Sequence, residues 1–136
     1  MISRSTEWAR RNKDRVAMKD RERKGTLDGK LTSLVTQSKY RSKQSDREHS
    51  IDTAYLRGLF IGQEGKCALS GIEMTIIGER GTEDYWKSIS IDRINSDIGY
   101  IEGNVQLVCT GVNYMKKDMS DTLFIDFCHK VVENSK

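Results

Sequence analysis

The fold is decided by the stretch SISIDRINSDIGYIEGNVQLVCTGVNYMKK, residues 88–117. Its first part, Ser88–Ile94, alternates polar and apolar side chains, which is typical of a strand. Val105–Val108 predicts a second short strand, and the glycines at 99 and 103 mark turns in the loop between the two. Apolar side chains then recur every three or four residues, which predicts a helix whose buried face carries Val108, Val112, Met115 and Met119.

Further helices are expected on both sides of this unit. Upstream, Asp52 can cap a helix that ends at Gly62 and Gly65 and has an apolar face made of Tyr55, Leu56, Leu59 and Phe60. Between them, Cys67–Met74 indicates a turn or short hairpin around Ser70 and Gly71. Downstream, Ser120 is expected to cap a last helix that buries Leu123, Phe124, Phe127, Cys128 and Val131. The fold class is therefore α+β.

The first 50 residues are basic and predict two helices. Ser5 or Thr6 can cap a helix that runs to Gly25, but its apolar residues form no continuous stripe. A turn is expected around Asp28 and Gly29, followed by a second helix whose apolar face carries Leu31, Leu34 and Val35. We interpret residues 1–50 as a basic helical N-terminal arm and residues 51–136 as the core.

Size and charge limit the class of protein. A chain of 136 residues suits one domain with a modest core. Residues 1–50 hold 14 Lys and Arg against 7 Asp and Glu, although the whole chain has a net charge of only +3. Such an asymmetry favours a polyanionic partner for the arm, although a charged, solvated surface would produce it as well. No apolar run is long enough for a membrane span, and three widely spaced cysteines make no disulfide framework, so we expect a cytoplasmic protein without a membrane partner.

The polar residues of the central stretch resemble the HNH, or ββα-metal, endonuclease family over roughly residues 66–128. In that family the first strand ends in Asp-His, an Asn follows at the second strand, and a His or Asn lies on the helix. The matching positions here are Asp92-Arg93, Asn104 and Asn113. The resemblance implies a small ββα-metal core with flanking helices, and a metal-dependent DNA endonuclease, with a phage or mobile element as one setting.

The chemistry of these residues agrees with phosphodiester hydrolysis. Asp92 and Asn113 would offer two oxygen ligands, which suit Mg²⁺ or Mn²⁺ better than zinc. By the resemblance, Asn104 braces the loop between the strands. Taken singly, Asp92 is as well explained as a turn cap and Asn113 as a helix N-terminal residue that bonds the backbone.

Arg93 departs from the family pattern, because arginine cannot lose its proton and so cannot activate water as the usual histidine does. Arg93 can instead bind the phosphate and stabilise the transition-state charge. Our preferred general base is His49, with a solvated loop histidine as the alternative reading. His129 on the last helix is expected to be a surface residue, and Tyr100 is a further candidate for positioning or proton transfer.

A structural zinc is not expected, because the family's two Cys-x-x-Cys pairs read here as Cys67-Ala-Leu-Ser70 and Cys109-Thr-Gly-Val112. Cys67 and Cys109 are instead expected to be neighbours in a zinc-free core. DNA contacts are expected from the basic arm and the helix after Asn113, namely Arg10, Arg11, Arg15, Lys39, Arg41, Lys43, Lys116 and Lys117.

Two functions thus compete. One is hydrolysis of DNA phosphodiesters with a bound metal. The other is a DNA-binding module of the same ancestry that has lost catalysis, which the missing Asp-His histidine favours. A basic protein that coats nucleic acid would need neither Asp92 nor Asn113. A homodimer is left open.

Overall fold

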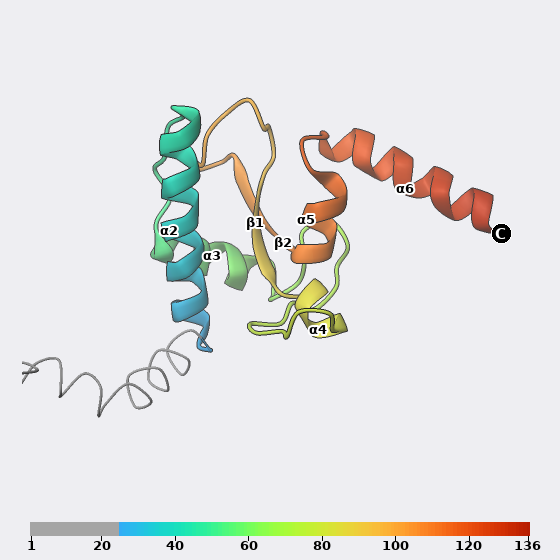
Figure 1. The fold of residues 1–136 in the computed structure, drawn as a ribbon, viewed down its shortest axis with the longest axis horizontal. Helices are drawn as coiled ribbons and strands as arrows, with labels where there is room; N and C mark the ends of the chain where they lie inside the picture. Colours follow the sequence, from blue (N-terminus) through green and yellow to red (C-terminus); the bar gives the residue numbers. More distant parts are fainter. Residues whose placement is uncertain (1–24) are drawn as a thin grey trace, which may run out of the picture.

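The computed structural model describes residues 25–136, and Figure 1 shows how its elements are arranged. The first expected helix and the DNA contacts expected from Arg10, Arg11 and Arg15 lie outside the described residues. The elements in chain order are α2 (Leu27–Ser45), α3 (Thr53–Gly62), α4 (Glu83–Trp86), β1 (Ile89–Arg93), β2 (Val105–Cys109), α5 (Thr110–Lys116) and α6 (Asp121–Ser135).

A two-stranded antiparallel sheet lies at the centre, between α2 on one side and α5 on the other (Figure 1). Its register runs from Ile89 opposite Cys109 to Arg93 opposite Val105. Helix α5 starts directly after β2, and the backbone N–H of Thr110 donates to the carbonyl of Ser88, so the helix folds back beside β1. The order of strand, loop, strand and helix and the α+β class are confirmed.

Helices α2 and α3 close the core from the other side. The side chain of Thr26 accepts from Gly29 N and caps α2, so Asp28 and Gly29 lie in the first helical turn, and the turn expected there is wrong. Leu31 and Val35 of α2 are buried in the same core as the sheet. The Asp52 cap of α3 is confirmed, because its carboxylate accepts from Tyr55 N at 2.8 Å.

The segment between α3 and β1 folds as a hairpin and a short helix. Lys66 and Glu73 form an antiparallel bridge, and Gly71 at φ 71° makes the expected turn. A left-handed backbone of this kind favours glycine. The side chain of Thr82 caps α4, which brings Tyr85 and Trp86 beside the end of α5.

Helix α6 differs from its prediction. The cap by Ser120 is confirmed, and Phe124 is buried, but Leu123, Phe127 and Val131 are exposed and Val131 is 67% accessible. Met115 on α5 is exposed too. The apolar residues of α6 spread over more than one face, and the helix runs away from the body so that only its Phe124 side meets the core (Figure 1). None of the helices within residues 25–136 has the length and apolar character to cross a membrane.

Candidate metal and phosphate site

Asn104 holds the loop between the strands in place. Its side-chain oxygen accepts from Asn95 N at 2.9 Å, and its amide nitrogen donates to the carbonyl oxygens of Asn95 at 3.0 Å and Gly99 at 2.9 Å. Because the residue is buried, these bonds are shielded from water. This is the bracing role that the resemblance implies, and it fixes where β1 ends.

Asp92 lies near the end of β1 with only 3% of its surface exposed. Its Oδ2 accepts from Lys116 Nζ at 2.6 Å and from Gln106 Nε2 at 2.9 Å. The described residues supply no hydrogen bond to its Oδ1. The carboxylate is therefore held rigidly by one oxygen, and the other oxygen remains available to a ligand.

Asn113 lies on α5 and faces the same strand. Its amide nitrogen donates to Ser90 Oγ and, at 3.3 Å, to the carbonyl oxygen of Ile91. A carbonyl oxygen can only accept, so these bonds fix which end of the amide is the nitrogen. The side-chain oxygen of Asn113 therefore faces away from β1 and has no partner among residues 25–136.

Asp92 and Asn113 line one pocket of about 310 Å³. The remaining lining residues come from β1, the following loop, α2 and the end of α5: Arg41, Ile91, Arg93, Ser96, Tyr100, Lys117 and Asp118. The lining includes three cationic side chains, those of Arg41, Arg93 and Lys117. It also includes two carboxylates, Asp92 and Asp118, and Asp92 already has a lysine partner. The pocket therefore favours an anion beside two free oxygen ligands.

Arg93 reaches this pocket although it directly follows Asp92 in β1. Neighbouring strand residues ordinarily point to opposite faces. Because Arg93 is the last strand residue, its long side chain extends past the edge of the sheet, where its guanidinium carbon lies 5.2 Å from the centre of the Tyr100 ring. The ring thus supports the guanidinium by a cation–π contact, and Nη1 also donates to the carbonyl oxygen of Ile98 at 3.4 Å.

The DNA contact expected from Lys116 is wrong. Lys116 is completely buried, and its Nζ lies 2.6 Å from Asp92 Oδ2 and 2.9 Å from Asp121 Oδ1. Burial by itself lowers the pKa of this amine, but the hydrogen bonds and charges of Asp92 and Asp121 outweigh it, so the pKa of Lys116 is raised. Lys116 is a structural cation at the back of the site, whereas Lys117 is exposed and lines the pocket.

A signal for this burial exists in the sequence. Lys116 follows Val112 by four residues, so it continues the apolar stripe of α5 into the core. Its partner Asp121 lies beyond a turn, and Gln106 lies on the other strand. No spacing rule joins these three residues, and sequence analysis missed Gln106, Asp118 and Asp121.

His49 does not line this pocket. Its Nε2 lies 2.8 Å from Ser38 Oγ on α2, and its ring packs near Tyr100 at 6.2 Å between centroids. Burial, followed by the nearby charge of Lys39, lowers the pKa of His49. Tyr100 thus lies near both Arg93 and His49, and His49 does not share a pocket with Asp92. His49 as the general base remains a prediction.

The other sequence-based candidates lie elsewhere. His129 is exposed on α6, and Lys39 and Lys43 are exposed on α2 and line no part of this pocket. Cys67 and Cys109 are buried free thiols, and both contact Ser70, as expected for neighbours in the core.

The chain matches no known protein family, no curated protein and no solved structure.

Proposed function

We propose that this protein is a metal-dependent endonuclease that hydrolyses phosphodiester bonds in DNA. One observation carries the proposal: Asp92 and Asn113 each have a side-chain oxygen without a partner among the described residues, and both line a pocket with Arg41, Arg93 and Lys117. Oxygen ligands beside unpaired cations are what a metal-bound phosphate needs.

The donor atoms fit Mg²⁺ or Mn²⁺. Asp92 and Asn113 both offer hard oxygen donors. Mg²⁺ is commonly held by one or two protein oxygens while water and phosphate oxygens complete the shell. Within residues 25–136 no cluster of three or more His, Cys, Asp or Glu could hold a metal, so the site proposed here relies on the Asp92 and Asn113 pair. When bound, the ion would polarise the phosphate and offset charge on the leaving oxygen.

The protein's own groups divide the remaining work. Lys116 and Gln106 orient the Asp92 carboxylate through its Oδ2. Arg93, supported by the Tyr100 ring, can bind the non-bridging phosphate oxygens with its fork of donors. Lys117 and Arg41 add positive charge on the two sides of the pocket.

A proton acceptor for the attacking water is also required. Asp118 lines the pocket and carries a carboxylate without an ion-pair partner in the described part of the chain. This position makes Asp118 a stronger candidate than His49, which contacts Ser38 and Tyr100 but does not line the pocket. Proton transfer needs hydrogen-bond reach, directly or through one water molecule.

A second function is favoured by a specific contact. The ammonium of Lys116 lies 2.6 Å from Asp92 and already neutralises its charge, which weakens the attraction for a divalent cation. Together with arginine in place of the usual base, this contact favours a DNA-binding module that has lost catalysis. Asp121 shares the same lysine at 2.9 Å, so the group of three keeps a net negative charge, and we prefer the enzyme.

Cleavage of supercoiled plasmid separates the two functions. Purified protein is incubated with plasmid and Mg²⁺, Mn²⁺ or a chelator, and nicked and linear products are resolved on a gel. The enzyme predicts cleavage that needs the metal and that falls at least a hundredfold in Asp92→Asn, a substitution that preserves the shape of the side chain. Asp97→Asn, which changes an exposed carboxylate in the neighbouring loop, is the matched control. DNA binding without cleavage in the presence of either metal would instead support the DNA-binding module that has lost catalysis.

A further inference from the structure

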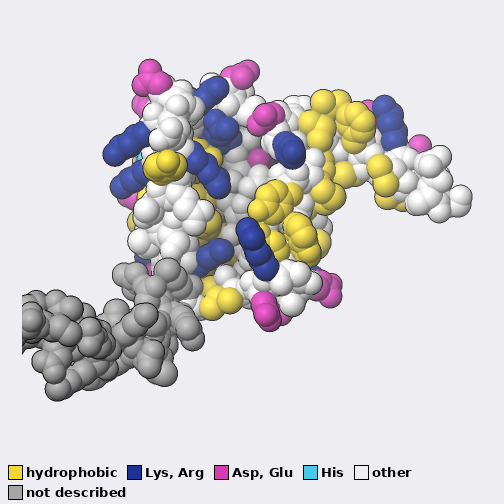
Figure 2. All heavy atoms as spheres, in the orientation of Figure 1, with side chains coloured by type: hydrophobic (Ala, Val, Ile, Leu, Met, Phe, Trp, Pro, Cys, Tyr) yellow, Lys and Arg dark blue, Asp and Glu magenta, His cyan; other side chains and the backbone are white. Residues whose placement is uncertain are grey.

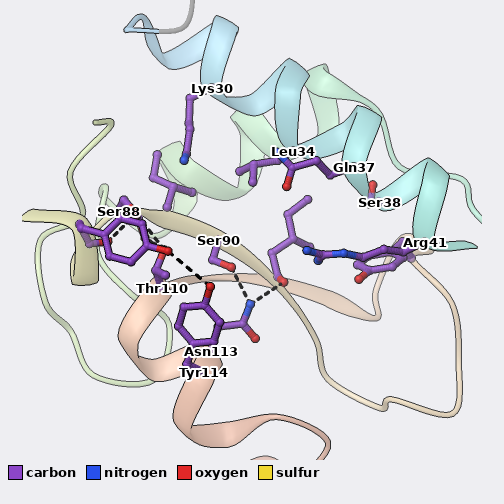
Figure 3. A pocket seen from close by; sticks show the side chains of 14 residues that line it. Lys30, Leu34, Gln37, Ser38, Arg41, Ser88, Ser90, Thr110, Asn113 and Tyr114 are labelled. Carbon is purple, nitrogen blue, oxygen red and sulfur yellow. Dashed lines mark hydrogen bonds between the residues drawn. The ribbon is translucent and has the colours of Figure 1, made fainter. Parts of the chain in front are cut away.

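A second pocket, of about 200 Å³, lies between α2 and α5 and runs over β1 (Figure 3). From α2 it is lined by Lys30, Leu34, Gln37, Ser38 and Arg41. The opposite wall is formed by hydroxyls and rings, among them Ser90, Thr110 and Tyr114. A water molecule takes up about 30 Å³ in the liquid, so the volume of this pocket is too large for a packing defect between side chains. It is also too small to admit a DNA double helix.

Within residues 25–136, the cations of this pocket have no counter-ion. Lys30 is half-buried and directs its ammonium into the pocket, as Figure 3 shows, and burial lowers its pKa. No carboxylate of residues 25–136 pairs with Lys30 or with Arg41, which lies eleven positions later on the same face of α2. A partly buried cation without a partner is costly. An anionic group in this pocket would remove that cost.

An aromatic cluster adjoins the same pocket. Trp86 of α4 packs edge to face against two tyrosine rings. Its ring centroid lies 5.3 Å from that of Tyr85 on α4 and 5.7 Å from that of Tyr114 on α5. Tyr114 is nevertheless 53% exposed, and Trp86 is 46% exposed. Arg80 lines the outer side of this cluster. Exposed rings beside cations are the arrangement on which proteins stack unpaired bases.

This pocket leads directly to the proposed metal site. The two pockets share Arg41, Ile91, Tyr100 and Asn113 as lining residues. In the space-filling view, Lys and Arg side chains gather around a hollow on this face (Figure 2). A bound strand could therefore run from the aromatic cluster, past Lys30 and Arg41, to Asp92 without leaving the surface.

We propose that this pocket binds the nucleotides next to the scissile phosphodiester as an unpaired single strand, with backbone phosphate on Lys30 and Arg41 and a base stacked on Tyr114. The proposal rests on the proposed endonuclease function and names its substrate class, DNA with a single-stranded segment at the cut. Stacking requires an unpaired base, because the faces of a paired base are covered by its neighbours. The narrow space between α2 and α5 likewise admits one strand.

Binding is measured by fluorescence in the presence of a chelator, so that no turnover is needed. The chain has two tryptophans, and Trp8→Phe leaves Trp86, beside the site, as the only reporter. A single-stranded oligonucleotide of about twelve bases is titrated against a blunt duplex of the same sequence. We expect quenching of Trp86 and at least tenfold tighter binding of the single strand.

Two variants locate the bound strand. Tyr114→Ala should weaken single-strand binding about tenfold or more, whereas Tyr114→Phe, which keeps the ring, should bind normally. Lys30→Gln should lower the slope of log K against log salt by about 0.7, the value for one lost phosphate contact on a single strand. Tyr40→Ala and Lys130→Gln change an exposed tyrosine and an exposed lysine outside the pocket, and they should change neither quantity.

The proposal is overturned if single strand and duplex bind equally, or if Tyr114→Phe loses as much affinity as Tyr114→Ala. Unchanged binding in Lys30→Gln would likewise show that no backbone phosphate binds to Lys30 in this pocket. Because these measurements need no cleavage, a protein that never cuts plasmid still gives a decisive result. Metal-dependent cleavage without a preference for the single strand would uphold the endonuclease and reject the substrate class.

Discussion

Replacing Lys116 by methionine tests whether the buried ion pair supports the candidate site. Methionine has a similar length and can occupy the apolar path of the lysine stem, so the substitution removes mainly the charge. The ammonium of Lys116 has no exposed surface and contacts Asp92 Oδ2 at 2.6 Å, Asp121 Oδ1 at 2.9 Å and the carbonyl oxygen of Arg93 at 3.2 Å. Without it, Asp92 remains buried, and Gln106 is its only side-chain donor within the described part of the chain.

The expected loss follows from this uncompensated charge. Removing one partner of a buried ion pair costs about 3–5 kcal/mol, which is a large share of the roughly 5–15 kcal/mol that stabilises a typical domain. For a small protein whose free energy of unfolding falls by roughly 2 kcal/mol per molar urea, the unfolding midpoint should fall by about 2 M. The transition is followed by far-UV circular dichroism.

Two further variants make this test decisive. Lys117→Met changes the exposed neighbour and should alter the free energy of unfolding by no more than about 0.5 kcal/mol. Asp92→Asn combined with Lys116→Met removes both charges and should recover part of the loss, because the two residues are directly coupled. Equal urea midpoints for Lys116→Met and Lys117→Met would refute the reasoning, and so would a double variant no more stable than Lys116→Met.

Three other perturbations have clear signs. Gly99→Ala should destabilise the protein by about 2 kcal/mol or more, because its new Cβ would overlap the carbonyl oxygen of Glu48. Gly58→Ala in α3 places its new Cβ in open space and should stabilise the protein by about 0.4–1 kcal/mol. Urea unfolding of the two variants measures both changes. Asn104→Ala should cost about 1–3 kcal/mol in the same assay and speed hydrogen exchange in the loop that it braces, and normal exchange there would contradict the role. His49 has a folded-state pKa below its ordinary 6.5, so its neutral form favours the folded protein; this contribution is complete above pH 6.5 and is lost as the pH falls through the folded-state pKa. The free energy of unfolding should therefore drop on acidification below pH 6.5, less so in His49→Gln, and parallel profiles for the two proteins would exclude His49 as the cause.

The local structure of this protein was largely predictable from its sequence. The alternation before Ile94 predicted β1, and the apolar repeat after Val108 predicted α5. The helix caps Asp52 and Ser120 were correctly identified. These features depend on hydrogen bonds and side-chain periodicity within a few residues, so their causes are contained in the local sequence.

The same local reasoning failed where burial depends on a neighbour. The apolar residues of α6 predict a buried face, but whether Phe127 or Val131 is covered depends on what packs against the helix. The body covers Phe124 and, in part, Cys128. Asp28 and Gly29 favour a turn by composition, yet the Thr26 cap and the packing of Leu31 begin a helix there.

For the candidate site, the sequence predicts Asp92, Arg93 and Asn113, and the three residues do line one pocket, because α5 directly follows β2 and folds back against β1. Only the tertiary structure decided that Lys116 turns inward to Asp92 and Asp121, that Arg41 and Asp118 join the pocket, and that His49 stays outside it. A side chain's role in a site depends on which distant charges share its low-dielectric surroundings. The spacing of residues in the sequence does not show which distant charges become neighbours when the chain packs.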